Sequence, residues 1–162
     1  MEHNKLRFAL FGNIYQGKKS ASIQQVLSCI NNSEAELYVD MEYYYFLKDN
    51  QRLDIKATKL FTDDDFEADF VISMGGDGTF LKAASRVGAK SIPILGVNMG
   101  RLGFLADISP DQFAPTIDAL YHDDYYLESR ALIQVETDGA PLGTYRCALN
   151  DVAILKRDTA SM

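Results

Sequence analysis

Short, continuous apolar runs are the first regular feature of the chain. Residues 8–11, 70–74 and 92–97 form such runs, which are typical of strands buried on both faces of a parallel sheet. Residues 36–40 predict a further strand, whereas residues 48–69 are polar and acidic and are interpreted as a solvated connection. The pattern therefore predicts a sheet of parallel strands.

Helical patterns occupy the stretches between these runs. Apolar residues at positions 23, 26, 27 and 30 recur every three or four residues, as do those at 80, 81, 84 and 87, which predicts two amphipathic helices. Gly88 fits a C-cap after the second of them, and the sequence Ser-Pro-Asp-Gln at 109–112 begins a third helix with a capping box. The alternation continues to about residue 123 and predicts an α/β fold with a doubly wound, mostly parallel, Rossmann-like sheet.

The pattern changes in the last quarter of the chain. Residues 131–137 alternate between apolar and polar side chains, an Asp-Gly turn signal follows, and residues 145–155 form a second strand-like run. We therefore expect two domains. Residues 1–125 are predicted to be an α/β nucleotide-binding domain, and residues 126–162 the first strands of a β-rich domain that is truncated at Met162.

Composition and charge narrow the classes of function. The 162-residue chain carries 16 basic and 23 acidic residues, a net charge of −7, which argues against a protein that coats nucleic acid, because such proteins present a basic surface. No apolar run approaches the roughly 20 residues of a membrane span, and the polar start of the chain does not resemble a signal peptide. These features favour a cytoplasmic protein without nucleic-acid or membrane partners.

Cysteine and histidine are scarce. Cys29 and Cys147 are interpreted as unpaired, buried thiols rather than as a disulfide or a metal site. With two histidines in the whole chain, a histidine-based catalytic or zinc site is not expected. No residue is therefore assigned as a metal ligand.

The sequence Gly75-Gly76-Asp77-Gly78-Thr79 lies between a predicted buried strand and a predicted helix. In an open parallel sheet, ligands bind at the carboxyl ends of the strands. Glycines there allow the backbone to approach a phosphate beside the helix N-terminus. The alternative is a tight strand-to-helix turn in which Asp77 only caps the helix. The spacing differs from both the dinucleotide fingerprint G-x-G-x-x-G and the Walker loop.

Three segments together resemble one family. Residues 75–79 resemble the GGDGT sequence shared by NAD kinases, diacylglycerol kinases and sphingosine kinases, and 6-phosphofructokinases carry a related GGDG. Residues 96–105 (Gly-Val-Asn-Met-Gly-Arg-Leu-Gly-Phe-Leu) closely resemble a second segment of NAD kinases that lipid kinases do not usually have. Residues 148–152 resemble the Asn-Glu motif of NAD kinases, with Asp151 in place of Glu. The resemblance covers essentially the whole chain, but only part of a family member.

The resemblance implies a kinase that phosphorylates the 2′-hydroxyl of the adenosine ribose of NAD to give NADP. ATP or another phosphoryl donor and Mg²⁺ or another divalent cation are implied with it. Asp77 resembles the family's general base, which accepts the hydroxyl proton. The expected binding residues are Gly78, through its backbone; Lys82, one helical turn later, toward a phosphate; Phe104, against the adenosine; and Asn150 with Asp151, on the dinucleotide. For Lys82, a solvated helix lysine is the equally open alternative.

Two other functions remain open at this point: a lipid- or sugar-phosphate kinase of the same GGDG superfamily, and a non-catalytic nucleotide-binding fragment. Because the family's acceptor site needs residues beyond Met162 and usually a second subunit, little or no activity is expected of the 162-residue form. The four aromatic residues at 43–46 are expected to begin a short helix and to remain partly exposed or at an interface. Together with an unpaired β edge, they predict a homo-oligomer, either a dimer or a tetramer.

Overall fold

The computed structural model describes residues 5–15, 17, 19–100, 103–139 and 147–153 of the chain. The chain forms two compact units, Met1–Leu127 and Glu128–Met162. The predicted division into domains at residue 125 stays a prediction.

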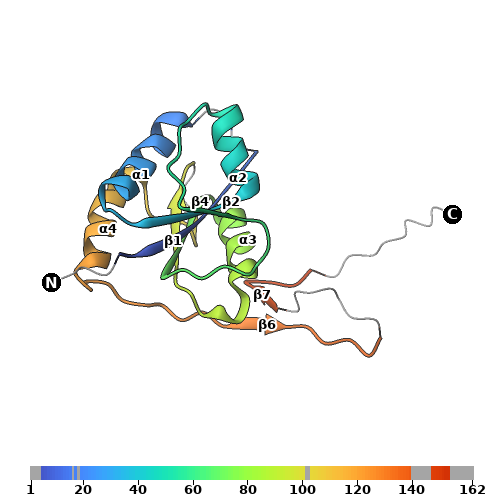
Figure 1. The fold of residues 1–162 in the computed structure, drawn as a ribbon. Coiled ribbons are helices and arrows are strands. Elements are labelled where there is room, and N and C mark those ends of the chain that lie inside the picture. The colour runs from blue at the N-terminus through green and yellow to red at the C-terminus, as the bar shows by residue number, and fades with distance from the viewer. Residues whose placement is uncertain (1–4, 16, 18, 101–102, 140–146, 154–162) are drawn as a thin grey trace. The chain divides into compact units, whose positions relative to one another are not determined.

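The first unit is built on a five-stranded sheet (Figure 1) in the order β3-β2-β1-β4-β5, and every pairing in it is parallel. This arrangement confirms the predicted α/β fold with a doubly wound sheet. The strands are β1 (Arg7–Gly12), β2 (Glu36–Asp40), β3 (Lys59–Phe61), β4 (Phe70–Gly75) and β5 (Ile94–Asn98).

The strand order reverses direction between β1 and β4. From β1 the chain builds outward through β2 to β3, and it then crosses to the other side of β1 to add β4 and β5. In doubly wound sheets, ligands bind in the crevice outside the carboxyl ends of the two strands at this switch point. The fold therefore points to the loops that follow β1 and β4.

Helices cover both faces of the sheet. The helices α1 (Ser20–Asn32) and α4 (Phe113–Tyr121) pack together on one face, and α3 (Asp77–Val87) covers the other (Figure 1). The short helix α2 (Met41–Tyr45) continues into a π-helical turn, Phe46–Asn50, and single 3₁₀ turns span Gly88–Lys90 and Pro110–Gln112.

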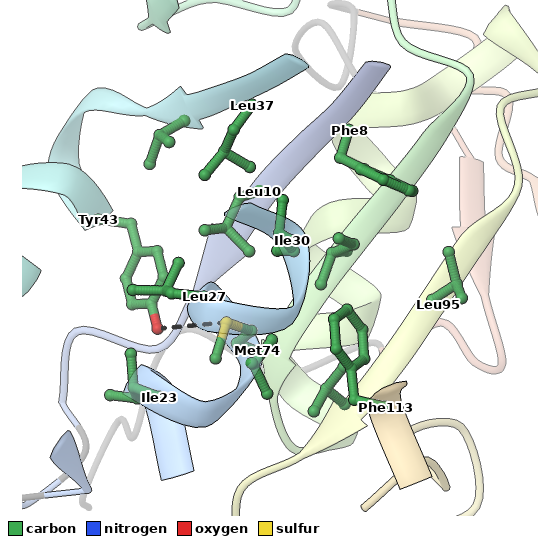
Figure 2. Packing of buried hydrophobic residues seen from close by; sticks show 14 of the residues in the cluster. Phe8, Leu10, Ile23, Leu27, Ile30, Leu37, Tyr43, Met74, Leu95 and Phe113 are labelled. Carbon is green, nitrogen blue, oxygen red and sulfur yellow. Dashed lines mark hydrogen bonds between the residues drawn. The ribbon is translucent and has the colours of Figure 1, made fainter. Parts of the chain in front are cut away.

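The larger hydrophobic core lies between the sheet and α1, α2 and α4. Figure 2 shows it around Leu10 of β1 and Met74 of β4, with Phe113 of α4 and Tyr43 of α2 packed against them. Odd and even residues of a strand face opposite sides of the sheet, and a second cluster, with Phe11, Val71 and Ala83, fills the space under α3. Because both faces are covered, the strands read as continuous apolar runs.

The predicted helix ends are confirmed. Gly88 follows α3 with a φ of 54°, a left-handed conformation that suits glycine. Ser109 and Gln112 form the capping box before α4, with the Ser109 backbone N–H donating to Gln112 Oε1 at 3.1 Å.

One expectation for residues 41–69 is wrong. The stretch interpreted as a solvated connection contains strand β3 and three buried apolar side chains, those of Ile55, Phe61 and Phe66. They lie in a mostly polar stretch and form no periodic pattern, and the neighbouring elements bury them. The expectation for the aromatic residues at 43–46 is confirmed. They lie in α2 and the turn after it, and they are partly exposed: Tyr43 and Phe46 are buried and stack at a ring distance of 6.0 Å, whereas Tyr45 is 50% exposed.

The described part of the second unit is an antiparallel pair of strands, β6 (Leu132–Gln134) and β7 (Cys147–Leu149), in which Ile133 pairs with Ala148. The antiparallel pairing of the predicted hairpin is confirmed, with shorter strands than expected among the described residues, whereas residues 140–146 of its connection lie outside them. The prediction of two buried thiols is wrong, because Cys147 is exposed and Cys29 only partly buried, although both are free. Among the described residues, no helix has the length and apolar character needed to cross a membrane.

Candidate functional site

The glycine turn after β4 lies at the switch point. Strand β4 ends at Gly75 and α3 begins at Asp77, so Gly76 is the N-cap residue, and its carbonyl accepts the backbone N–H groups of Thr79 and Phe80 at 3.0 and 3.1 Å. The alternative in which Asp77 only caps the helix is therefore wrong. Its side chain is engaged elsewhere.

The Asp77 carboxylate accepts hydrogen bonds from three consecutive backbone amides of the loop after β5. Phe104 N–H donates to Oδ2 at 2.9 Å, and the N–H groups of Leu105 and Ala106 donate to Oδ1 at 2.9 and 3.1 Å. Gly103 makes the approach possible, because a Cβ atom there would lie 2.2 Å from Oδ1. The two glycine-rich segments thus meet at one carboxylate.

These amides change the acidity of Asp77. Hydrogen bonds to the charged form favour it, and the N–H of Phe104, followed by those of Ala106 and Leu105, lowers the pKa of Asp77 below its usual value. The carboxylate is therefore ionised at neutral pH. It can accept a proton, although more weakly than a carboxylate without such donors.

Asn98, at the end of β5, holds the other end of the same loop. Its side chain is buried, its Nδ2 donates to the Ala106 carbonyl at 3.2 Å, and its Oδ1 accepts the Gly100 N–H at 2.8 Å. Asn98 is not among the site residues predicted from the sequence. The signal that identifies Asn98 is a polar residue in the final position of an otherwise apolar strand.

The glycines of the site fall into two groups. Gly75 and Gly96 are close-packed, since a Cβ atom would lie 2.2 Å from Thr79 Oγ1 in the first case and 2.7 Å from Ala106 Cα in the second. At Gly76, Gly78 and Gly100, by contrast, a Cβ atom would meet no atom of the described residues within 4 Å, apart from chain neighbours and the helix's own backbone. The open group leaves space beside the turn, where a ligand can approach the backbone.

The loop after β1 completes the switch point. Asn13 N–H donates to the Met74 carbonyl at 3.1 Å, which ties this loop to β4, and the next residues expose Tyr15. Gly12 packs directly against the Tyr43 ring. The buried hydroxyl of Tyr43 donates to Met74 Sδ at 4.0 Å (Figure 2). Burial raises the pKa of Tyr43, so this hydroxyl stays neutral. The sequence pattern did not predict this contact.

Two of the predicted binding residues lie on the surface of the first unit. Lys82 of α3 pairs with Glu42 of α2 at 3.4 Å, and both side chains are more than half exposed. Phe104 is 96% exposed, although its backbone N–H is bound to Asp77. The backbone of Phe104 is thus anchored to Asp77, while its ring is open to solvent.

Asn150 and Asp151 belong to the second unit. Both are exposed, and Asn150 has a φ of 89° just after β7. The predicted role of this pair therefore stays a prediction. Among the residues that the structure describes, no group of three or more His, Cys, Asp or Glu side chains is arranged to hold a metal ion.

The sheet order and the glycine loops at its switch point define a doubly wound α/β domain with a ligand edge at the carboxyl ends of β1 and β4. Residues 13–125 match the family model described as the ATP-NAD kinase N-terminal domain. The chain belongs to the NAD kinase family.

Individual relatives of the chain carry the same family name. The chain is 50% identical over 157 residues to an NAD kinase of Bacteroides fragilis and 39% identical over 158 residues to one of Porphyromonas gingivalis. These matches cover 97% and 96% of the chain but 54% of each relative, so the chain spans about half their length. The crystal structure of yeast NADH kinase complexed with NADH is also similar, with a TM-score of 0.61 over 80% of this chain and 40% of that one. At 14% identity, that likeness shows the fold alone.

Proposed function

We propose that the protein containing this chain is an NAD kinase, which transfers a phosphoryl group from ATP to the 2′-hydroxyl of the adenosine ribose of NAD. The observation that carries the proposal is the junction of the two glycine-rich segments at Asp77, on the carboxyl edge of the sheet. Family membership and the open space beside Gly76, Gly78 and Gly100 support it.

Asp77 is the carboxylate that we propose as proton acceptor. Phosphoryl transfer asks the protein mainly for positioning and for stabilisation of charge, with a base to receive the hydroxyl proton. Within the described part of the first unit, Asp77 is the acidic residue of the glycine turn itself and is ionised at neutral pH. We propose that a ribose hydroxyl bound beside Gly78 approaches the Asp77 carboxylate.

The binding roles follow from exposure. Phe104 presents an open aromatic ring on which an adenine can stack. Lys82 can bind a phosphate only after exchanging its ion pair with Glu42, and exposed pairs of this kind contribute roughly 0–1 kcal/mol. We propose Asn150 and Asp151 as further dinucleotide contacts, because amide and carboxylate groups suit base edges and ribose hydroxyls.

We propose a divalent cation, Mg²⁺ or a similar ion, as the companion of ATP. Mg²⁺ keeps several waters and commonly binds through substrate phosphates and one or two carboxylates. We therefore propose that the ATP phosphates and water hold the cation, since both oxygens of Asp77 already accept backbone N–H groups. We also propose that the complete protein is a homo-oligomer.

The test is NADP formation with Mg²⁺-ATP, followed by mass spectrometry. The chain is assayed beside a form extended by the remaining sequence of the Bacteroides fragilis relative, and an Asp77→Asn variant of the extended form serves as the control. We expect NADP from the extended form and little from the 162-residue chain. A folded extended form that phosphorylates a lipid or a sugar phosphate but not NAD would overturn the proposal.

A further inference from the structure

The link between Asp77 and the loop after β5 does more than satisfy one carboxylate. Both oxygens of Asp77 are used, and the three donors are consecutive in the chain, 27, 28 and 29 residues beyond it. Hydrogen bonds to an ionised acceptor are stronger than neutral ones. A single side chain therefore binds the amides of Phe104, Leu105 and Ala106.

Apolar packing offers this segment little alternative support. Phe104 is almost fully exposed and Leu105 half-buried, so the first buried side chain after Gly103 is that of Ala106. Asn98 binds the Gly100 N–H and the Ala106 carbonyl, which holds both ends of the loop but not the Phe104 amide. The position of Phe104 thus depends on Asp77.

We propose that Asp77 is a positioning residue for the loop that carries Phe104, in addition to its proposed part as proton acceptor. The inference rests on the proposed function, since the ligand that this loop contacts is taken to be the dinucleotide. A carboxylate that only removed a proton would affect turnover and leave binding unchanged. A carboxylate that holds the loop affects binding as well.

Two substitutions break the link from opposite sides. Asp77→Asn keeps one acceptor oxygen, but its NH₂ group meets an amide donor of the loop, so at least one hydrogen bond is lost. Gly103→Ala leaves the carboxylate intact and places a Cβ atom 2.2 Å from Oδ1, which forces the two apart. Asp107→Asn is the matched control, because it removes the same charge from an exposed position just beyond the loop.

The first measurement is amide hydrogen exchange on the 162-residue chain. In the wild type we expect slow exchange at Phe104, Leu105 and Ala106. Exchange there should be about tenfold faster or more in Asp77→Asn and Gly103→Ala, because each variant loses charge-assisted hydrogen bonds that protect these amides. Amides within β4 should be unchanged, which shows that the variants are folded, and Asp107→Asn should match the wild type. Equal protection of the three amides in Asp77→Asn would overturn the proposal.

The second measurement is the equilibrium binding of NAD to the extended form used for the NADP assay. We expect Asp77→Asn and Gly103→Ala to weaken binding about tenfold, as the loss of a bond of roughly 1.4 kcal/mol predicts, and Asp107→Asn to have no effect. An Asp77→Asn variant that binds NAD like the wild type but has lost turnover would overturn the positioning role. If the wild type itself binds no NAD, the proposed function fails, while the exchange result still decides whether Asp77 holds the loop.

Discussion

At the scale of single residues, the switch point is built on contacts that only glycine allows. Gly12 ends β1 against the flat face of the Tyr43 ring, and a Cβ atom there would lie 1.9 Å from Cζ. Tyr43 is fully buried and anchors α2 to the core. The absence of one side chain on β1 therefore determines how closely α2 approaches the edge of the sheet.

Replacing Gly12 by alanine should destabilise the fold. Because the ring is enclosed and cannot move without displacing its neighbours, we expect a loss of about 1–3 kcal/mol in the free energy of unfolding, as for other overpacked cores. Urea denaturation measures it. Gly17→Ala is the control, since a Cβ atom at Gly17 meets no atom within 4 Å. Equal stability of the two variants would show that the contact is not tight.

A second residue-scale prediction concerns pH. Arg7 donates to Asp69 from Nη2 at 2.9 Å and from its backbone N–H at 2.8 Å, and the guanidinium holds the pKa of Asp69 below its usual value. A carboxylate with a depressed folded-state pKa stabilises the protein above its unfolded-state pKa, and that contribution is lost as pH falls through the folded-state value.

We therefore expect the wild type to be more stable than Asp69→Asn at neutral pH, and the difference to shrink below about pH 4. Urea denaturation across this pH range gives the two curves. Glu67→Gln should behave like the wild type, because Glu67 lies 3.6 Å from the same arginine but is 89% exposed. A difference between wild type and Asp69→Asn that stays constant with pH would contradict the assignment.

At the scale of elements, Arg86 connects α3 to the edge of the sheet formed by β2 and β3. Its guanidinium is largely buried, pairs with Asp40 and with Asp64, and lies over the rings of Phe11 and Phe61 at 5.0 and 5.5 Å. It also donates to the carbonyls of residues 62 and 63, at 3.1 and 2.7 Å. One side chain thus joins α3 to the ends of β2 and β3.

Arg86→Ala should be strongly destabilising, because it leaves the buried Asp40 carboxylate without its partner, and such losses are about 3–5 kcal/mol. Arg86→Lys should recover only part of the loss, since an ammonium group cannot reproduce the planar fork. Lys82→Ala on the same helix is the control and should change stability by less than about 1 kcal/mol. Thermal or urea unfolding distinguishes them, and a fully restored Arg86→Lys variant would reduce the role of Arg86 to charge alone.

The same elements show what sequence patterns can predict. Strands buried on both faces, such as β4, and helices with a regular stripe, such as α1, follow from local periodicity. Strand β3 does not, because three residues at a sheet edge form no period and are defined by pairing with β2. Local pattern therefore predicted four of the five strands, including the edge strand β5, and missed the short edge strand β3.

The candidate site likewise has a part that the sequence predicts and a part that it does not. The glycine turn and Asp77 were visible as a short motif between a strand and a helix. The three hydrogen bonds from the Phe104–Ala106 amides to Asp77 could not be predicted in this way, because they join segments 27 to 29 residues apart that only the folded sheet brings together. The roles of the predicted site residues stay predictions.

At the scale of the whole molecule, the two units differ in how much apolar surface they bury. Every buried apolar side chain of the described residues lies between Phe8 and Leu120, in the first unit. In the second unit, the side chains of Leu132, Ile133 and Val152 remain more than 40% exposed. A two-stranded hairpin is marginal in water by itself, and exposed apolar strands favour association with another chain.

We therefore predict that the 162-residue chain self-associates through residues 128–162, and that a chain ending at Leu127 is folded and monomeric. Light scattering over a range of concentrations measures the mass, and urea unfolding tests the fold. Ile133→Lys should lower the association of the 162-residue chain, because it places a charge on the exposed strand β6. Glu128→Lys lies outside the strands and should change the association less. Association of the shorter chain to the same extent would move the interface to the first unit, and a monomeric 162-residue chain at high concentration would contradict self-association altogether.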